Sequence, residues 1–246
     1  MNITVEIYCI KIPQKVSNLE FYLNNYLDFE EKKEFSIYKT LYRKLEFLFG
    51  RILLKSFLAK ALNVSFEEIR IKKNEYGKPY LDNCKIDKPL SFNLTHSNGL
   101  LLLAISNLES IGIDVEEYNK QDYLELVNTV CTLDEKEYIQ QSHNKQLKNK
   151  KFLFLWTRKE ALLKYISKGF TLDPRQISVP FYKNIEKKGS LLYCTFYPCN
   201  NFISSLVIES KNDKIPLINI NYLKLEGSNF ISTEERVLDY NKQFSL

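Results

Sequence analysis

The sequence is poor in the residues from which zinc sites and disulfide frameworks are built. It has two histidines, His96 and His143, and five cysteines, an odd number with no pair spaced as C-x-x-C. Zinc in proteins is held by closely spaced cysteine and histidine ligands, and a disulfide framework needs paired cysteines. We therefore expect neither, and predict reduced, buried thiols in a cytoplasmic protein.

Long apolar runs are also lacking. The longest spans residues 100–105, far short of the roughly 20 residues that cross a bilayer as a helix. The first residues, MNITVEIYCIKIP, have neither the basic start nor the extended apolar stretch of a signal peptide. We expect no association with a membrane.

Glycine and proline are few, seven of each, which argues against a disordered chain. The net charge is a mild +5, and the densest basic run, NKQLKNKK at 144–151, contains no aromatic residue. Grooves that bind nucleic acid usually combine basic and aromatic side chains. The weakly basic surface instead suits a polyphosphate or an acidic protein, and argues against nucleic acid.

The hydrophobic pattern predicts an α+β protein without regular alternation of strand and helix. Strands are expected at residues 3–12, 100–106, 111–116, 176–180, 190–197, 202–209 and 217–224. Another strand is expected just before a turn at 76–79, and a short one that ends near residue 93. Helices are expected at residues 17–35, 38–62, 121–129, 133–141 and 152–169, with a basic loop at 143–151.

This order of elements divides the chain into two halves of similar content. They cover residues 1–106 and 107–225, and a polar tail follows at 226–246. No low-complexity linker separates the halves, so we expect them to pack closely against each other.

The segment IGIDVEEY predicts a strand with one acidic face. Because side chains alternate along a strand, Asp114 and Glu116 share a face with Gly112, which leaves room for a ligand. Two neighbouring carboxylates repel each other, and a cation between them would offset that repulsion. A solvated acidic edge strand is the alternative.

Oxygen donors without clustered cysteine or histidine favour a hard cation, Mg²⁺ with Mn²⁺ as the alternative. Mg²⁺ is commonly held by one or two carboxylates and completed by water and substrate phosphates. A phosphate-bearing substrate is therefore the expected companion.

The segment FNLTHSNG gathers Asn93, Thr95, His96 and Ser97 at a strand end beside a turn. Such groups can donate hydrogen bonds to phosphate oxygens. A hydrogen-bonded turn with an exposed histidine is the alternative. A serine hydrolase is disfavoured, because no G-x-S-x-G elbow is present.

Lys78, in EYGKPYL, lies on a turn of rigid backbone, where we expect it to be exposed. It could bind phosphate as a point charge or remain solvated. The GK pair does not belong to a P-loop, because the upstream glycine and the following serine or threonine are missing.

The helix predicted at 152–169 carries charge near its apolar side. Trp156, Glu160 and Lys164 are four residues apart and share a face, and Lys159 lies inside the apolar arc. The simpler explanation is that Glu160 and Lys164 form a surface ion pair and that the stem of Lys159 extends toward solvent. Buried charge would instead require a partner or a ligand.

Together, FNLTHS, GIDVE and the later WTRKEALLK resemble the motifs of the 4′-phosphopantetheinyl transferase superfamily. The length and the extra N-terminal half resemble its Sfp-type, surfactin-synthetase-activating branch. The resemblance implies two similar α/β halves that form a pseudo-dimer, with the active site in the cleft between them. It implies transfer of 4′-phosphopantetheine from coenzyme A to a serine of an apo acyl or peptidyl carrier protein, with release of 3′,5′-adenosine bisphosphate.

The resemblance also implies roles for single residues. Asp114, Glu116 and Glu160 match metal-binding carboxylates, and Glu160, His96 and Lys164 match groups that act in catalysis. The residues matched to coenzyme A are Arg43, Lys73, Lys78, Thr95, His96, Asp114 and Lys164, with Arg43 and Lys73 toward the adenosine 3′-phosphate.

The implied reaction needs a base for the carrier serine, which is Glu160 or a water it shares with the metal. An acidic carrier helix would suit the weakly basic enzyme, with apolar residues near 117–140 as its dock. Because the second half completes the cleft, we expect a monomer.

Two other functions compete with this one. Another Mg²⁺-dependent phosphoryl or nucleotidyl transferase would need a nucleotide loop, and no P-loop or kinase glycine-rich loop is present. A non-catalytic module that binds coenzyme A or a carrier protein predicts the loss of one carboxylate, whereas all three are present.

Overall fold

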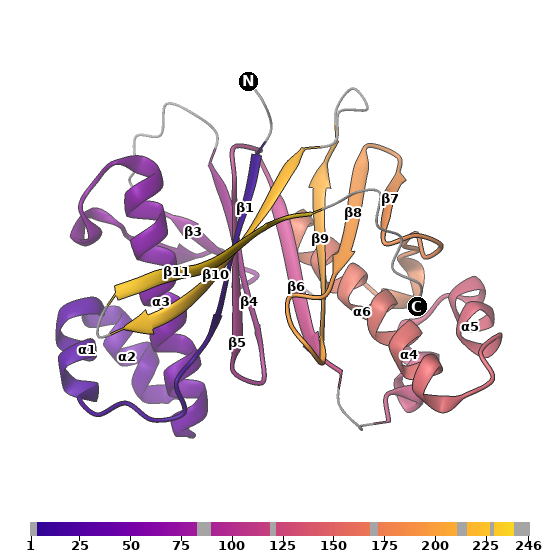
Figure 1. Cartoon of the computed structure of the whole chain (residues 1–246), viewed down its shortest axis with the longest axis horizontal. Coiled ribbons are helices and arrows are strands. Elements are labelled where there is room, and N and C mark those ends of the chain that lie inside the picture. The colour runs from indigo at the N-terminus through magenta and orange to yellow at the C-terminus, as the bar shows by residue number, and fades with distance from the viewer. Residues whose placement is uncertain are drawn as a thin grey trace.

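The computed structural model of the chain describes residues 4–82, 90–118, 122–167, 172–210, 216–226 and 229–238. Its centre is a pair of sheets that share a hydrophobic core, and helices cover the outer side of each sheet (Figure 1). The molecule therefore has four layers, in the order helices, sheet, sheet, helices. This is the α+β arrangement of two α/β halves that the sequence predicts.

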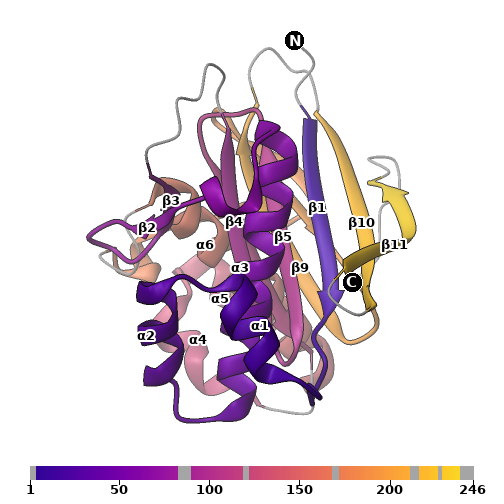
Figure 2. The same cartoon turned by 90° about the vertical axis from the view of Figure 1, so that its left-hand side faces the viewer.

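The first half is built on a five-stranded sheet of order β11-β10-β1-β5-β4. Its strands are β1 (Thr4–Lys11), β4 (Ser91–Ser97), β5 (Leu100–Ser106), β10 (Leu217–Glu226) and β11 (Asn229–Val237). Helices α1 (Leu19–Tyr26), α2 (Phe29–Ile37) and α3 (Leu41–Leu62) cover it (Figure 2). A 3₁₀ turn (Phe66–Glu68) and a small hairpin, β2 (Ile71–Lys73) and β3 (Pro79–Leu81), follow α3.

The second half is built on a four-stranded sheet of order β6-β9-β8-β7. Its strands are β6 (Ile111–Glu117), β7 (Ile185–Lys188), β8 (Leu191–Phe196) and β9 (Phe202–Glu209). The long helix α6 (Lys145–Ile166) packs on it, with the shorter helices α4 (Val127–Val130) and α5 (Leu133–Gln140) beside α6. Two 3₁₀ turns, Leu124–Leu126 and Pro174–Gln176, complete this layer.

The four-layer order explains why β5 is apolar at every position before its last residue, Ser106. Three of its alternate residues enter the core between the sheets, namely Leu100, Leu102 and Ala104. The other three enter the core under α3, namely Leu101, Leu103 and Ile105. A strand that is buried on both faces needs a continuous apolar run rather than an alternating one.

Gly112 marks the point where α6 comes closest to β6. A Cβ atom at this position would lie 1.9 Å from the carbonyl oxygen of Ala161 and 2.5 Å from the backbone nitrogen of Tyr165. Both are backbone atoms of α6, so a larger residue could not be accommodated by a side-chain rotation. The expectation that Gly112 leaves room for a ligand is wrong, because the helix backbone fills that space.

Most predicted elements are confirmed, and two helix predictions are corrected. The single helix expected at 17–35 is two helices, because Asp28 caps α2 through a reciprocal capping box with Glu31. The basic loop expected at 143–151 is the first part of α6, capped by Asn144, whose Oδ1 accepts a hydrogen bond from Leu147 N at 2.7 Å. The sequence did not indicate a helix there, because residues 144–151 are mostly polar and show no apolar periodicity.

Two strand predictions are also corrected. The strand expected to end near residue 93 continues to Ser97, so Thr95 and His96 lie within β4 rather than in a turn. The predicted turn is confirmed at Asn98-Gly99, where both residues have positive φ, 40° and 78°. The strand expected at 176–180 is absent, and Pro174–Gln176 forms a 3₁₀ turn instead.

The end of the chain departs most from expectation. Strand β10 does not complete the second half but pairs in parallel with β1 of the first sheet. The polar tail expected at 226–246 contains β11, which pairs antiparallel with β10. The pairing of β10 with β1 joins residues that are distant in sequence, whereas β10 and β11 are consecutive strands. Residues 227–228 and 239–246 lie outside the described ranges.

Cys9, Cys131 and Cys194 are buried free thiols and Cys199 is a half-buried one, while Cys84 lies outside the described residues. None of the helices in the described ranges combines the length and apolar character needed to cross a membrane.

Replacing Gly112 by alanine should destabilise the protein, because the new methyl group would overlap the backbone of α6. We expect the free energy of unfolding, measured by urea denaturation, to fall by about 3 kcal/mol. Gly189→Ala is the control, because Gly189 has φ of +62° but no atom within 4 Å of a Cβ, and should lose only about 1 kcal/mol. Equal losses in the two variants would contradict the close approach.

Candidate active site

The two halves meet where β4 and β6 lie side by side, and polar side chains of β4 reach across to β6. Thr95 Oγ1 donates to Asp114 Oδ1 at 3.1 Å, and Ser97 Oγ donates to Glu116 Oε2 at 3.1 Å. Alternate residues of a strand share a face, so the same face of β4 also carries Asn93. Side chains from both halves therefore build one polar cluster.

Helix α6 closes this cluster from the other side. Trp156 Nε1 donates to Glu116 Oε1 at 3.2 Å, and Lys164 Nζ donates to Asp114 Oδ1 at 2.7 Å. Glu160 lies one turn from each of them on the same helix face. Residues four apart on α6 therefore lie opposite residues two apart on β6. This is possible because the backbones of α6 and β6 come very close to each other at Gly112.

Two carboxylate oxygens in the cluster have no partner among the described residues. Asp114 Oδ2 and Glu160 Oε1 are buried and accept no hydrogen bond, although the two residues are only 5% and 8% exposed. Burial, and next the charge of Asp114, raise the pKa of Glu160 to about 7, against the opposing effect of Lys164. Unpaired buried carboxylates are costly, so this cluster calls for a cation or a proton.

Glu116 differs from the other two carboxylates. Burial and then Asp114 raise its pKa, while the hydrogen bonds from Trp156 and Ser97 act in the opposite direction. Both of its oxygens accept these hydrogen bonds. Glu116 is therefore oriented by its neighbours, and the open oxygens belong to Asp114 and Glu160.

These residues fit a hard cation, although they do not form a complete metal cage. Within the described ranges no three His, Cys, Asp or Glu side chains are arranged to hold a metal by themselves. Mg²⁺ is commonly bound by only one or two protein carboxylates, with water and phosphate oxygens completing its shell. Asp114 Oδ2 and Glu160 Oε1 offer that number of open donors.

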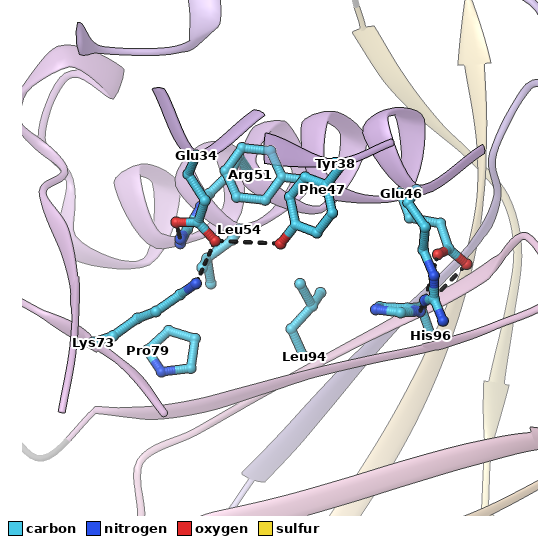
Figure 3. A pocket seen from close by; sticks show the side chains of 11 residues that line it. Glu34, Tyr38, Glu46, Phe47, Arg51, Leu54, Lys73, Pro79, Leu94 and His96 are labelled. Carbon is cyan, nitrogen blue, oxygen red and sulfur yellow. Dashed lines mark hydrogen bonds and ion pairs between the residues drawn. The ribbon is translucent and has the colours of Figure 1, made fainter. Parts of the chain in front are cut away.

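Two adjoining cavities lead away from the cluster. The first, of about 280 Å³, is lined by Glu160, Lys164 and Lys78 among others. The second, of about 240 Å³, lies between α3, β4 and the β2–β3 hairpin (Figure 3). They share Pro79 and Leu94 as lining residues, so a long ligand could extend from one into the other.

Lys78 is less exposed than the sequence predicts. Its Nζ donates to the carbonyl oxygen of Lys164 at 2.6 Å and to Ser167 Oγ at 2.8 Å. These contacts cap the C-terminal end of α6, and burial lowers the pKa of Lys78 to about 8. The lysine is half-buried and joins the β2–β3 hairpin to α6.

The second cavity holds the other predicted coenzyme residues. His96 faces it, on the opposite side of β4 from Thr95, as strand alternation requires. Arg43 and Lys73 line it too, and each forms an ion pair with a carboxylate, Arg43 with Glu46 at 2.8 Å and Lys73 with Glu34. The predicted site residues therefore separate into an acidic cluster and a cavity beside it.

Sequence reasoning missed the two carboxylates of this cavity, Glu34 and Glu46. Both lie on helices with many other charged residues, so no spacing distinguishes them from surface acids. Glu46 is only 3% exposed. Its burial follows from the packing of α3 on β4, which the local pattern does not reveal.

The charge of Lys159 inside the apolar arc of α6 has a structural partner. Its Nζ lies 2.7 Å from Glu135 Oε2, and both side chains are fully buried. It also donates to the carbonyl oxygens of Val130 and Pro174 at 2.8 and 2.7 Å. Lys159 therefore ties α5 and the turn at 174–176 to α6, and it faces neither cavity.

Comparisons with known proteins agree with the resemblance. A model of the 4′-phosphopantetheinyl transferase superfamily matches residues 110–207, and a model of the N-terminal part of 4′-phosphopantetheinyl transferase matches residues 16–108. The 4′-phosphopantetheinyl transferase gsp of Aneurinibacillus migulanus is 30% identical over 200 residues, which cover 77% of this chain and 80% of that protein.

Two further relatives match a shorter stretch. The 4′-phosphopantetheinyl transferase HetI of Nostoc sp. strain PCC 7120 is 33% identical over 123 residues, covering 50% of this chain and 52% of that protein. The 4′-phosphopantetheinyl transferase Sfp of Bacillus subtilis strain 168 is 29% identical over 138 residues, covering 56% and 58%.

Replacing Glu160 by glutamine should stabilise the metal-free protein at pH 8. A carboxyl whose pKa is raised from about 4.3 in the unfolded chain to about 7 in the fold lowers stability as the pH rises through that interval. Above it, the glutamine variant should gain about 1–3 kcal/mol of unfolding free energy over the wild type. At pH 4 the two proteins should be equally stable.

The measurement is urea denaturation at pH 4 and pH 8 in the presence of a chelator. Glu137→Gln, on the exposed side of α5, is the control and should change neither value by more than about 0.5 kcal/mol. A Glu160→Gln variant less stable than the wild type at pH 8 would show that Glu160 has a stabilising partner.

Proposed function

The chain belongs to the 4′-phosphopantetheinyl transferase superfamily, and on this basis we propose that it transfers the 4′-phosphopantetheine arm of coenzyme A to a serine of an apo acyl or peptidyl carrier protein. The observation that supports this function best is the buried carboxylate cluster at the junction of the halves, in which two oxygens have no hydrogen-bond partner in the part of the chain that the structure describes. A cluster of this kind suits a reaction between polyphosphate and a hydroxyl nucleophile.

The coenzyme would occupy the two adjoining cavities. Lys164 and Thr95, at the edge of the acidic cluster, would donate hydrogen bonds to the pyrophosphate, and Lys78 lines the same cavity. His96, Arg43 and Lys73 would surround the adenosine in the second cavity. The shared wall at Pro79 and Leu94 supports a continuous path for one ligand.

A divalent cation, Mg²⁺ or Mn²⁺, would be held by Asp114, Glu116 and Glu160, with the open oxygens supplied by Asp114 and Glu160. When bound, it would offset the negative charge of the pyrophosphate and of the leaving group. Glu116 would keep its orientation through Trp156 and Ser97. Ser97 belongs to the first half and Trp156 to the second, so the site needs both.

The carrier serine must lose its proton as its oxygen attacks the phosphorus next to pantetheine. Glu160 is the side chain best suited to receive that proton, directly or through one water, because its buried Oε1 has no hydrogen-bond partner among the described residues. The amino group of Lys164, 2.7 Å from Asp114 Oδ1, would balance charge on the phosphate oxygens. The leaving group from coenzyme A is 3′,5′-adenosine bisphosphate.

The carrier protein would dock on the second half, near the helices that precede α6. Leu126 and Leu133 are 47% and 76% exposed there, and exposed apolar side chains of this kind suit a partner helix. The mild positive charge of the chain, +5, would attract an acidic carrier.

The test is to incubate the protein with coenzyme A, Mg²⁺ and apo carrier proteins of both acyl and peptidyl type, and to measure the carrier mass. The wild type should add phosphopantetheine, and Asp114→Asn should lower kcat/KM by about 100-fold or more, because an open carboxylate oxygen is lost. Glu117→Gln, at the next position of β6, should retain activity.

Failure to modify any carrier would refute the proposed function. Normal transfer by Asp114→Asn would refute the role of the acidic cluster while leaving the function in place. Circular dichroism and urea denaturation of each variant separate lost chemistry from lost folding.

A further inference from the structure

The α4–α5 corner, residues 126–140, lies beside α6 and carries the two exposed leucines to which a carrier protein would dock (Figure 1). Helix α4 has four residues and α5 has eight, and isolated helices shorter than about 12 residues are marginal in water. The apolar side chains that these two helices bury are Val130 and Ile139. Hydrophobic burial alone therefore does little to fix the position of the corner.

The buried ion pair of Glu135 and Lys159 holds the corner to α6. Lys159 Nζ lies 2.7 Å from Glu135 Oε2, and neither side chain is exposed. The same ammonium donates to the carbonyl oxygen of Val130, the last residue of α4, at 2.8 Å, and to that of Pro174 at 2.7 Å. An ammonium has three donors, so each donor of Lys159 has an acceptor.

The carboxylate of Glu135 also binds more than its ion-pair partner. Its Oε2 accepts a hydrogen bond from Thr132 N at 2.8 Å, which is part of the capping box that begins α5. Its Oε1 accepts a hydrogen bond from Val179 N at 3.3 Å. One ion pair therefore joins the end of α4, the start of α5 and the segment from 174 to 179 to the same point of α6.

A buried ion pair is a poor way to gain stability, because apolar side chains of the same size are often at least as stabilising. What it supplies is direction, since each hydrogen bond has a preferred length and angle. Lys159 is next to Glu160 in the sequence, and the two side chains leave the helix in different directions. Lys159 contacts the corner, and Glu160 belongs to the acidic cluster. A corner fixed to Lys159 is therefore also fixed relative to Glu160.

We propose that Glu135 and Lys159 are positioning residues for the carrier protein. They hold the α4–α5 corner where a carrier docked on its exposed leucines presents the serine to the acidic cluster. The inference rests on the proposed function and on its docking site. Both side chains are fully buried, so they act through the corner and touch neither the carrier nor the coenzyme.

The test uses the double variant Glu135→Gln/Lys159→Met, which removes both charges and nearly keeps the size of both side chains. One negative and one positive charge are lost, so the net charge stays at +5 and the attraction of an acidic carrier is unchanged. At saturating coenzyme A, the KM for the carrier should rise by about tenfold. The calorimetric Kd of coenzyme A, measured without a carrier, should stay within about twofold of the wild type.

The control is the double variant Glu226→Gln/Lys224→Met. It removes an ion pair of the same chemistry from β10 of the first half, where the two side chains are 53% and 67% exposed. Neither the KM for the carrier nor the Kd of coenzyme A should change. If the test variant folds poorly, judged by circular dichroism, Glu135→Asp replaces it. Glu135→Asp keeps both charges but shortens the carboxylate side chain by one methylene, and it should also raise the KM for the carrier.

A double-mutant cycle with Leu133 separates positioning from general loss of structure. In the wild type, Leu133→Ala should raise the KM for the carrier, because an exposed apolar contact is lost. In the pair variant the same substitution should add little, because the corner is already displaced and the two changes act on one contact. Effects that simply add in the two backgrounds would overturn the inference.

The outcomes also separate this inference from the proposed function. If the wild type modifies carriers and the pair variants keep the wild-type KM for the carrier, the inference fails and the proposed function stands. A Kd of coenzyme A that weakens as much as the KM for the carrier would also overturn it, because the pair would then support the whole site. If the wild type modifies no carrier, both fail.

Discussion

The site depends on one steric constraint, the contact between the backbone of α6 and Gly112 of β6. A Cβ at Gly112 would lie 1.9 Å from a backbone oxygen of α6, so only glycine allows this distance. Because the helix lies so close, its residues at a spacing of four meet strand residues at a spacing of two. Trp156 contacts Glu116 and Lys164 contacts Asp114. Glu160 lies between Trp156 and Lys164 on the same helix face and is only 8% exposed.

The acidic cluster and the cavity beside it differ in whether their charged side chains have partners. In the acidic cluster, two buried oxygens of Asp114 and Glu160 have no hydrogen-bond partner among the described residues, and a cation can offset their negative charge. In the cavity next to it, Arg43 and Lys73 are already paired with carboxylates. The acidic cluster therefore has open acceptor oxygens, whereas Arg43 and Lys73 in the cavity each have a carboxylate partner. Strand β4 joins them, because Thr95 and His96 point to opposite faces.

The sequence could predict the elements of the site because their spacing is local. Alternation placed Asp114 and Glu116 on one face, and the helical period placed Glu160 with Trp156 and Lys164. The sequence could not show which other element each of these faces packs against. We expected Gly112 to leave room for a ligand, but the backbone of α6 occupies that space. The sequence indicated that Lys159, if buried, needs a partner or a ligand, but not that the partner is Glu135. The pairing of β10 with β1 joins residues such as Asn219 and Glu6, and no local pattern carries information of that range.

The central claim is that Asp114 and Glu160 together hold a divalent cation at the junction of the halves. The most direct measurement is the anomalous diffraction of a crystal soaked with Mn²⁺, which locates the metal without reference to activity. The account predicts a peak in contact with Asp114 Oδ2 and Glu160 Oε1, and its loss in Glu160→Gln crystals. A peak that contacts neither oxygen, or one that persists unchanged in the variant, would contradict it.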